Sequence, residues 1–118
     1  RQLQGPSRSC RTVQPVNSNR ATNRPMDLRR LQDLMRELYG DADKERGVPS
    51  TVAWLTEELG ELAQAVRKGD IDEQTHEMGD VLAWLASLAN QLDIDLEQAV
   101  MRFANGCPKC GESPCVCS

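Results

Sequence analysis

The sequence predicts an all-α protein built as an antiparallel bundle of about four helices. Apolar residues recur at three- and four-residue spacing through most of residues 26–105, and no stretch shows the strict alternation of a strand. The polar links between these periodic segments are short, which makes consecutive helices antiparallel neighbours. We therefore expect one helical domain over 26–105, after a leader over 1–25 and before a cysteine-rich tail over 106–118.

The first two helices are expected from their apolar spacing and their breakers. A helix over residues 27–39 should end at Gly40, and the following residues, 40–49, read as a polar loop. A second helix should begin at Ser50 or Thr51, because either side chain can cap a helix.

The third and fourth helices follow short turns. Gly69 should end the second helix, and Asp70 should cap the third, with Glu73 three residues later completing a capping box. The third helix should reach about Leu92, and a short fourth helix should cover residues 96–104.

The leader differs in composition from the rest of the chain. Residues 1–25 contain five arginines, no acid and no apolar period, so we expect them to be disordered, with Cys10 unpaired. The basic run is also compatible with RNA binding. Because Met26 directly precedes the periodic segment, the leader is either native, an over-extended reading frame or an added segment.

Charge and hydropathy narrow the class of protein. The total charge is −4 and the leader contributes +5, so the remaining residues carry −9. A segment with this much negative charge disfavours binding of nucleic acid and favours binding of divalent cations. No apolar run approaches the roughly 20 residues that span a bilayer, and no secretory signal is visible. We expect a soluble cytoplasmic protein with no membrane partner.

Four acidic residues are expected to gather on one side of the second and third helices. At about 100° per residue, Glu58 and Glu61 lie to one side of the apolar stripe of the second helix, and Glu77 and Asp80 lie to the same side of the stripe of the third. When two helices pack antiparallel, the surfaces on the same rotational side of their apolar stripes face the same direction. The four acids should therefore lie along one edge of the helix pair. Four carboxylates there would repel unless a cation such as Mg²⁺ or Mn²⁺ neutralised them.

The alternative for these acids is a solvated face without a metal. Glu57 lies only about 40° from Glu61 on the helical wheel. Glu57 could bind a second metal ion or act as the base that activates a water. An exposed helix acid without a catalytic role is an equally good interpretation.

The spacing Glu57-Glu58-x-x-Glu61, fifteen residues, then Glu77-x-x-Asp80 resembles the signature of the MazG-like all-α nucleoside triphosphate pyrophosphohydrolases. The resemblance covers about residues 27–103. It implies Mg²⁺-dependent hydrolysis of a (d)NTP to the monophosphate and pyrophosphate, by a homodimer or tetramer. By position, the last four of these acids match the family's metal ligands, and Glu57 matches a proposed general base.

Phosphate binding departs from the family pattern. Family members often place a Lys and an Asn after the last motif, whereas this chain has Arg102 and Asn105. The resemblance implies that Arg102 replaces the Lys as a phosphate ligand.

The two tryptophans flank the acidic cluster. Trp54 is one turn before Glu58, and Trp84 is one turn after Asp80, both on the carboxylate side. They are candidates for stacking on the substrate base, or else they are core or subunit-interface residues.

Four cysteines crowd the tail. Cys107-x-x-Cys110-Gly is typical of half of a structural zinc site, and Cys115-x-Cys117 is a tighter second half. We expect one Zn²⁺; a redox-active or flexible thiol tail is the alternative.

Two other functions remain open from the sequence. One is a phosphoribosyl-ATP pyrophosphohydrolase, which resembles this family in fold and reaction. The other is a non-catalytic helical module that binds a partner through its zinc tail.

Overall fold

The computed structural model describes residues 24–118, and the described residues form helices without any strand. The elements are α1 (Leu28–Arg46), α2 (Val48–Lys68), α3 (Ile71–Gln91), α4 (Leu96–Val100) and the 3₁₀ helix η2 (Met101–Phe103). The all-α prediction is therefore confirmed. Among the described helices, none is both long and apolar enough to cross a membrane. The expectations for the leader and for Cys10 concern residues 1–23, which lie outside the described part.

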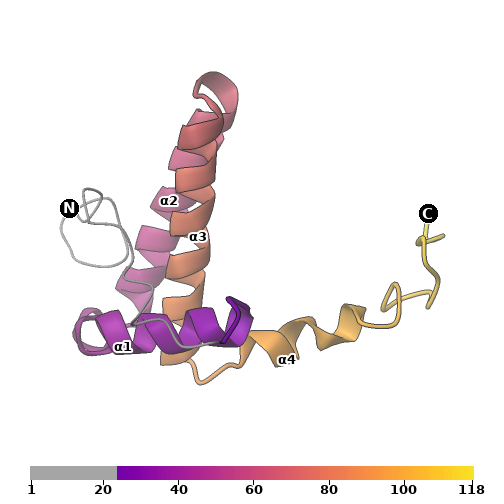
Figure 1. The fold of residues 1–118 in the computed structure, drawn as a ribbon, viewed down its shortest axis with the longest axis horizontal. Helices are drawn as coiled ribbons and strands as arrows, with labels where there is room; N and C mark the ends of the chain where they lie inside the picture. The colour runs from indigo at the N-terminus through magenta and orange to yellow at the C-terminus, as the bar shows by residue number, and fades with distance from the viewer. Residues whose placement is uncertain (1–23) are drawn as a thin grey trace.

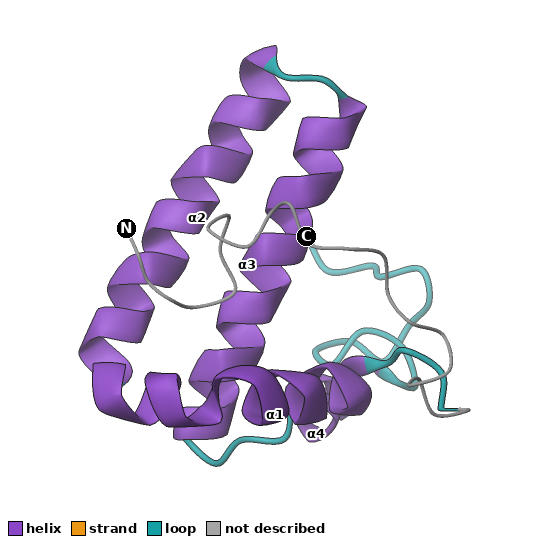
Figure 2. Ribbon diagram, turned by 60° about the vertical axis from the view of Figure 1, so that its left-hand side comes forward, coloured by secondary structure: helices purple, strands orange, loops and turns teal. Residues whose placement is uncertain are grey.

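α2 and α3 form a long antiparallel hairpin, and α1 lies across its open end (Figure 1). The same arrangement is visible after rotation in Figure 2, where α1 crosses the foot of the hairpin. From this foot, α4, η2 and the cysteine tail extend as an arm away from the hairpin. We call the segment from residue 96 to residue 118 the arm.

α1 is longer than its sequence predicted. Gly40 does not end the helix, which continues to Arg46 and stops at Gly47, where φ is 86°. A glycine inside a helix costs only about 1 kcal/mol, and the extra turns place Asp43 and Arg46 in the interior. Because α2 begins at Val48, the loop expected over residues 40–49 is reduced to Gly47.

Thr51, predicted as a cap, lies instead inside the first turn of α2. Its hydroxyl donates to the Gly47 carbonyl at 2.9 Å and accepts from the Gln91 amide at 2.8 Å. The residue is completely buried, so it joins the start of α2 to the end of α3.

The turn between α2 and α3 follows the prediction. Asp70 accepts from the Glu73 N–H at 2.9 Å, and the Glu73 carboxylate accepts from the Asp70 N–H at 2.9 Å, which is the expected capping box. α2 ends before Gly69, where a Cβ would lie 2.9 Å from the Ala65 carbonyl oxygen. This close approach requires glycine.

The interior is composed mainly of small residues. The cluster where α1 crosses α3 contains Met35, Ala83 and Ala86, and further alanines are buried along the hairpin. Trp84 is the one large side chain among the described residues that is both apolar and almost fully buried. A core of this kind removes little apolar area from water.

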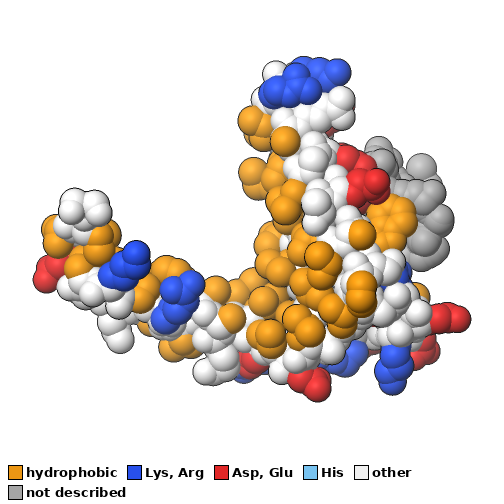
Figure 3. Space-filling view, turned by 180° about the vertical axis from the view of Figure 1, so that it is seen from behind, with side chains coloured by type: hydrophobic (Ala, Val, Ile, Leu, Met, Phe, Trp, Pro, Cys, Tyr) orange, Lys and Arg blue, Asp and Glu red, His pale blue; other side chains and the backbone are white. Residues whose placement is uncertain are grey.

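The apolar stripes of α2 and α3 do not form this interior. The hairpin instead closes on its carboxylate side, where Glu58 and Asp80 are buried. Figure 3 shows hydrophobic side chains gathered at the surface along the hairpin and over its foot. The exposed stripe residues are Val52, Leu59, Val66, Ile71, Met78, Leu82, Leu85 and Leu92.

Gln32 holds the base of the arm. Its side-chain amide donates to Asn90 at 3.1 Å and to the Ile94 carbonyl at 2.8 Å, and its oxygen accepts from the Leu96 N–H at 2.7 Å. Asn90 returns a hydrogen bond to the Gln32 carbonyl at 3.0 Å. One buried side chain therefore joins α1 to α3, to the following turn and to the start of α4.

We expect Gln32→Ala to lower the free energy of unfolding by about 2 kcal/mol, since it leaves two partly buried backbone groups without the partner that Gln32 supplies. Gln98→Ala, at an exposed position of α4, should change it by less than about 0.5 kcal/mol. Urea denaturation of both variants at equal protein concentration measures the difference. Equal midpoints would show that the arm does not depend on Gln32.

Candidate metal centre

Three of the four predicted acidic ligands meet between the two helices of the hairpin. Glu58 comes from α2, and Glu77 and Asp80 come from successive turns of α3. One carboxylate oxygen of each lies within 4.8 Å of the others. Two oxygens on one Mg²⁺ are at most about 4 Å apart, so small side-chain adjustments would bring all three onto one ion.

The surroundings of this cluster fit a hard cation. Glu58 is fully buried and Asp80 is 9% exposed, and a buried carboxylate is costly unless positive charge compensates it. Oε1 of Glu77 is buried and accepts no hydrogen bond within the described part of the chain. The ligand atoms are all carboxylate oxygens, which Mg²⁺ and Mn²⁺ prefer.

His76 lies beside the cluster. Its Nε2 lies 3.3 Å from Oδ2 of Asp80, one turn further along α3. The imidazole is 35% exposed and Asp80 is mostly covered. The partly exposed imidazole therefore lies against the mostly covered Asp80 carboxylate.

Glu61 stands outside the group of three. It lines a neighbouring hollow of about 680 Å³, together with Glu77, His76 and Lys68. The hollow lies between the helices toward the turn at Gly69, and Lys68 adds a positive charge to its rim. Glu57, the predicted base, is exposed on α2. The structure thus places a roomy, partly acidic hollow beside the buried carboxylates.

The two tryptophans form a stack beside the cluster. The ring centroids of Trp54 and Trp84 are 5.8 Å apart and the planes differ by 12°. Trp84 is 1% exposed and belongs to the interior, whereas Trp54 is half-buried. Of the two rings, Trp54 is the one that a ligand can approach.

Arg46 and Asp43 are buried residues that the sequence analysis missed. They form an ion pair, with side chains only 8% and 3% exposed. The Arg46 guanidinium also lies 4.8 Å from the ring centroid of Trp84, a cation–π contact. Their spacing of three residues would place both side chains on one face of a helix and so indicates an ion pair. The sequence analysis missed this pair because it ended the first helix at Gly40.

Arg102 is not brought to the carboxylates within one chain. It lies in η2 on the arm, away from the hairpin (Figure 1), and its guanidinium is 4.3 Å from the ring centroid of Phe103.

The tail cysteines come together at the end of the arm, and all four are free thiols. Backbone groups of Val116 and Glu112 lower the pKa of the Cys110 thiol to about 6 by hydrogen bonding to its sulfur. Hydrogen bonding among the crowded thiols, with Cys115 and then Cys107, raises the pKa of Cys117 to about 11.

Two curated proteins resemble this chain. YpjD of Bacillus subtilis strain 168, described as uncharacterised, is 48% identical over 58 residues, which cover 41% of this chain and 52% of that protein. The gene 37 protein of Mycobacterium phage L5 is 35% identical over 77 residues, covering 56% of this chain and 68% of that protein. The chain thus spans about half the length of YpjD.

A family model identifies the hairpin. The MazG nucleotide pyrophosphohydrolase domain matches residues 46–109, more than half of the chain. The matched segment contains the carboxylate cluster and the tryptophan stack, and it ends inside the cysteine tail. The chain belongs to the MazG nucleotide pyrophosphohydrolase family.

Proposed function

We propose that this protein is a Mg²⁺-dependent nucleoside triphosphate pyrophosphohydrolase, which converts a (d)NTP and water to a (d)NMP and pyrophosphate. The observation that carries the proposal is the meeting of Glu58, Glu77 and Asp80 within 4.8 Å in a MazG-family chain. Glu61 completes the proposed ligand set from the adjoining hollow.

The chain's own residues have distinct proposed roles. The four carboxylates hold the ion, which when bound neutralises phosphate charge and lowers the pKa of a water. His76 keeps Asp80 oriented from outside. The exposed carboxylate of Glu57 accepts the proton from the attacking water, and Lys68 at the rim of the hollow attracts the phosphates.

The base-binding side of the site is proposed to include Trp54. Trp84, covered in the interior, supports the ring of Trp54 and keeps it at a fixed angle. An aromatic face held in this way stacks on any base, so we place base recognition at Trp54 and assign Trp84 a supporting role.

We further propose that the active protein is a homo-oligomer, at least a dimer. The exposed stripes of α2 and α3 form a continuous apolar surface, and the alanine-rich interior of one chain is small. A second copy is the natural cover, because it carries the same surface. In such an assembly the arm reaches a neighbouring copy, and Arg102 then binds phosphate in that copy's site.

The reaction itself is tested by its products. With Mg²⁺ or Mn²⁺, we expect pyrophosphate from at least one nucleoside triphosphate, detected with and without added pyrophosphatase. Orthophosphate as the sole phosphate product would overturn the assignment. The substrate panel includes phosphoribosyl-ATP, since turnover of that compound alone would move the function to histidine synthesis, and no turnover at all would favour a non-catalytic module.

The carboxylate roles are tested by Asp80→Asn and Glu61→Gln. Each variant should lose at least about 100-fold in turnover, because a charge that stabilises the transition state is removed. In the absence of metal, each variant should be at least as stable as the wild type, because the substitution removes one negative charge from a repulsive cluster. Mg²⁺ should raise the melting temperature of the wild type but not of these variants.

Glu45→Gln is the matched control for that experiment, because Glu45 is an exposed acid of α1 that is not a member of the carboxylate group. It should keep both the turnover and the Mg²⁺-dependent rise in melting temperature. A near-wild-type Asp80→Asn at limiting Mg²⁺ would contradict the ligand role.

The oligomer is tested by Leu59→Glu, which puts a charge into the exposed stripe of α2, where Leu59 is 49% exposed. We expect the wild type to sediment as a dimer or larger, and this variant to shift toward the monomer. Lys44→Glu, at an exposed polar position of α1 outside the two stripes, should leave the assembly unchanged. A monomeric wild type at micromolar concentration in sedimentation or light scattering would refute the proposal.

A further inference from the structure

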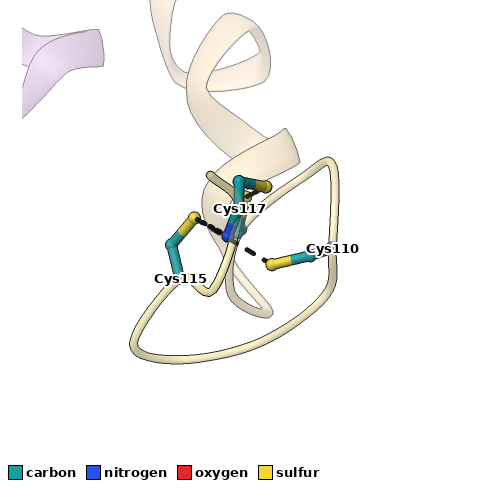
Figure 4. Close-up of side chains that lie close together, drawn as sticks. Cys110, Cys115 and Cys117 are labelled. Atoms are coloured by element: carbon teal, nitrogen blue, oxygen red, sulfur yellow. Dashed lines mark hydrogen bonds between the residues drawn. The ribbon is translucent and has the colours of Figure 1, made fainter.

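The cysteine tail is not part of the proposed hydrolytic site. Its four thiols belong to the C-terminal segment, which Figure 1 shows at the far end of the arm, and Figure 4 shows Cys110, Cys115 and Cys117 close together there. The carboxylates lie within the hairpin. The family match ends at residue 109, so Cys110, Cys115 and Cys117 lie beyond it. The tail therefore needs an explanation of its own.

The sulfur positions are those of a tetrahedral tetrathiolate site. Sγ of Cys107 lies 3.8 Å from Sγ of Cys117, and Sγ of Cys110 lies 4.0 Å from Sγ of Cys115. All four sulfurs lie within 4.8 Å of one another. In a tetrahedral site with Zn–S bonds of about 2.3 Å, neighbouring sulfurs are about 3.8 Å apart. The spacing greatly exceeds the roughly 2.05 Å of a disulfide bond.

The backbone is folded so that it presents these sulfurs inward. The Gly111 N–H donates to the Cys107 carbonyl at 2.7 Å, and the Cys107 N–H donates to the Glu112 carbonyl at 3.0 Å, which closes a tight turn. Gly111 has φ of 77°, a conformation that favours glycine. Two further N–H groups point at sulfur, from Lys109 to Cys107 at 3.4 Å and from Cys117 to Cys115 at 3.2 Å.

Gly106 also restricts the start of the turn. Its φ is 112°, and a Cβ there would lie 3.0 Å from the Gly111 carbonyl oxygen. Two glycines thus permit a chain reversal that other residues would resist.

Little besides the thiols can hold this turn together. From residue 108 onward the segment has no regular helix or strand, and Val116 is 69% exposed. Ordering these residues costs backbone entropy, which a few hydrogen bonds do not offset. Metal binding supplies folding free energy on the required scale in small cysteine knuckles.

We infer that Cys107, Cys110, Cys115 and Cys117 bind one Zn²⁺ ion as a structural site that folds the end of the arm. Four thiolates in a tetrahedron are the ligand set of closed zinc sites, which leave no position for water. The ion therefore has no step in hydrolysis, and its effect is on the order and stability of the tail.

The full chain, purified without chelator, is assayed by elemental analysis and by thiol titration. We expect close to one equivalent of zinc per chain, with the four tail thiols protected from a thiol reagent until a strong chelator removes the metal. Replacement by Co²⁺ should give the intense visible bands of tetrahedral tetrathiolate cobalt. Less than a tenth of an equivalent of zinc, or iron in its place, would overturn the inference.

Single substitutions locate the ligands. Cys110→Ser and Cys117→Ser should each abolish the cobalt spectrum and lower zinc retention at least tenfold, while Cys10→Ser, outside the group, should change neither. Circular dichroism checks that the helical body is intact, and the Co²⁺ spectrum of reconstituted wild type remains decisive if a serine variant fails to fold.

Pyrophosphate release should stay within about twofold in both tail variants, and its complete loss in a folded variant would overturn the separation of the two sites. Because metal content is measured without substrate, this test stands even if the proposed hydrolysis fails.

Discussion

The burial of carboxylates between α2 and α3 is the constraint on which the rest of this structure depends. Glu58 is completely covered and Asp80 nearly so, at the point where a helical hairpin would usually place leucine or valine. Charge in such a position must be compensated by cations or by ionised partners. The hairpin therefore buries a group of acidic side chains that could hold a divalent ion, in place of an apolar interior.

The same constraint explains where the apolar residues lie. Because the carboxylate sides of the two helices face each other, their aliphatic stripes point outward, and residues such as Leu59 and Leu85 remain exposed in one chain. The exposed apolar surface and the buried carboxylates thus follow from one choice of helix face. The metal site and the homo-oligomer that we propose both rest on it.

The arm depends on a different set of contacts. Gln32 and its partner Asn90 fix the turn after α3, and Arg29 pairs with Asp95 at 2.8 Å at the start of α4. These polar contacts set the direction in which the chain leaves the hairpin, and the cysteine turn closes its far end. The contacts at the two ends of the arm thus differ from those of the helical hairpin.

The sequence by itself determined the helical class and the α2–α3 turn, and it marked the acids and cysteines that could form clusters, because spacing and capping are local properties. The structure brings three of the four predicted acids together and leaves Glu61 at the neighbouring hollow. Asp70 with Glu73 and the paired acids at i and i+3 are visible without any partner. Only the tertiary structure decided which helix face is buried, since periodicity marks an apolar stripe but does not say what covers it. It likewise showed that α1 continues through Gly40, because the burial of Asp43 and Arg46 against the tryptophan stack outweighs a local preference to stop.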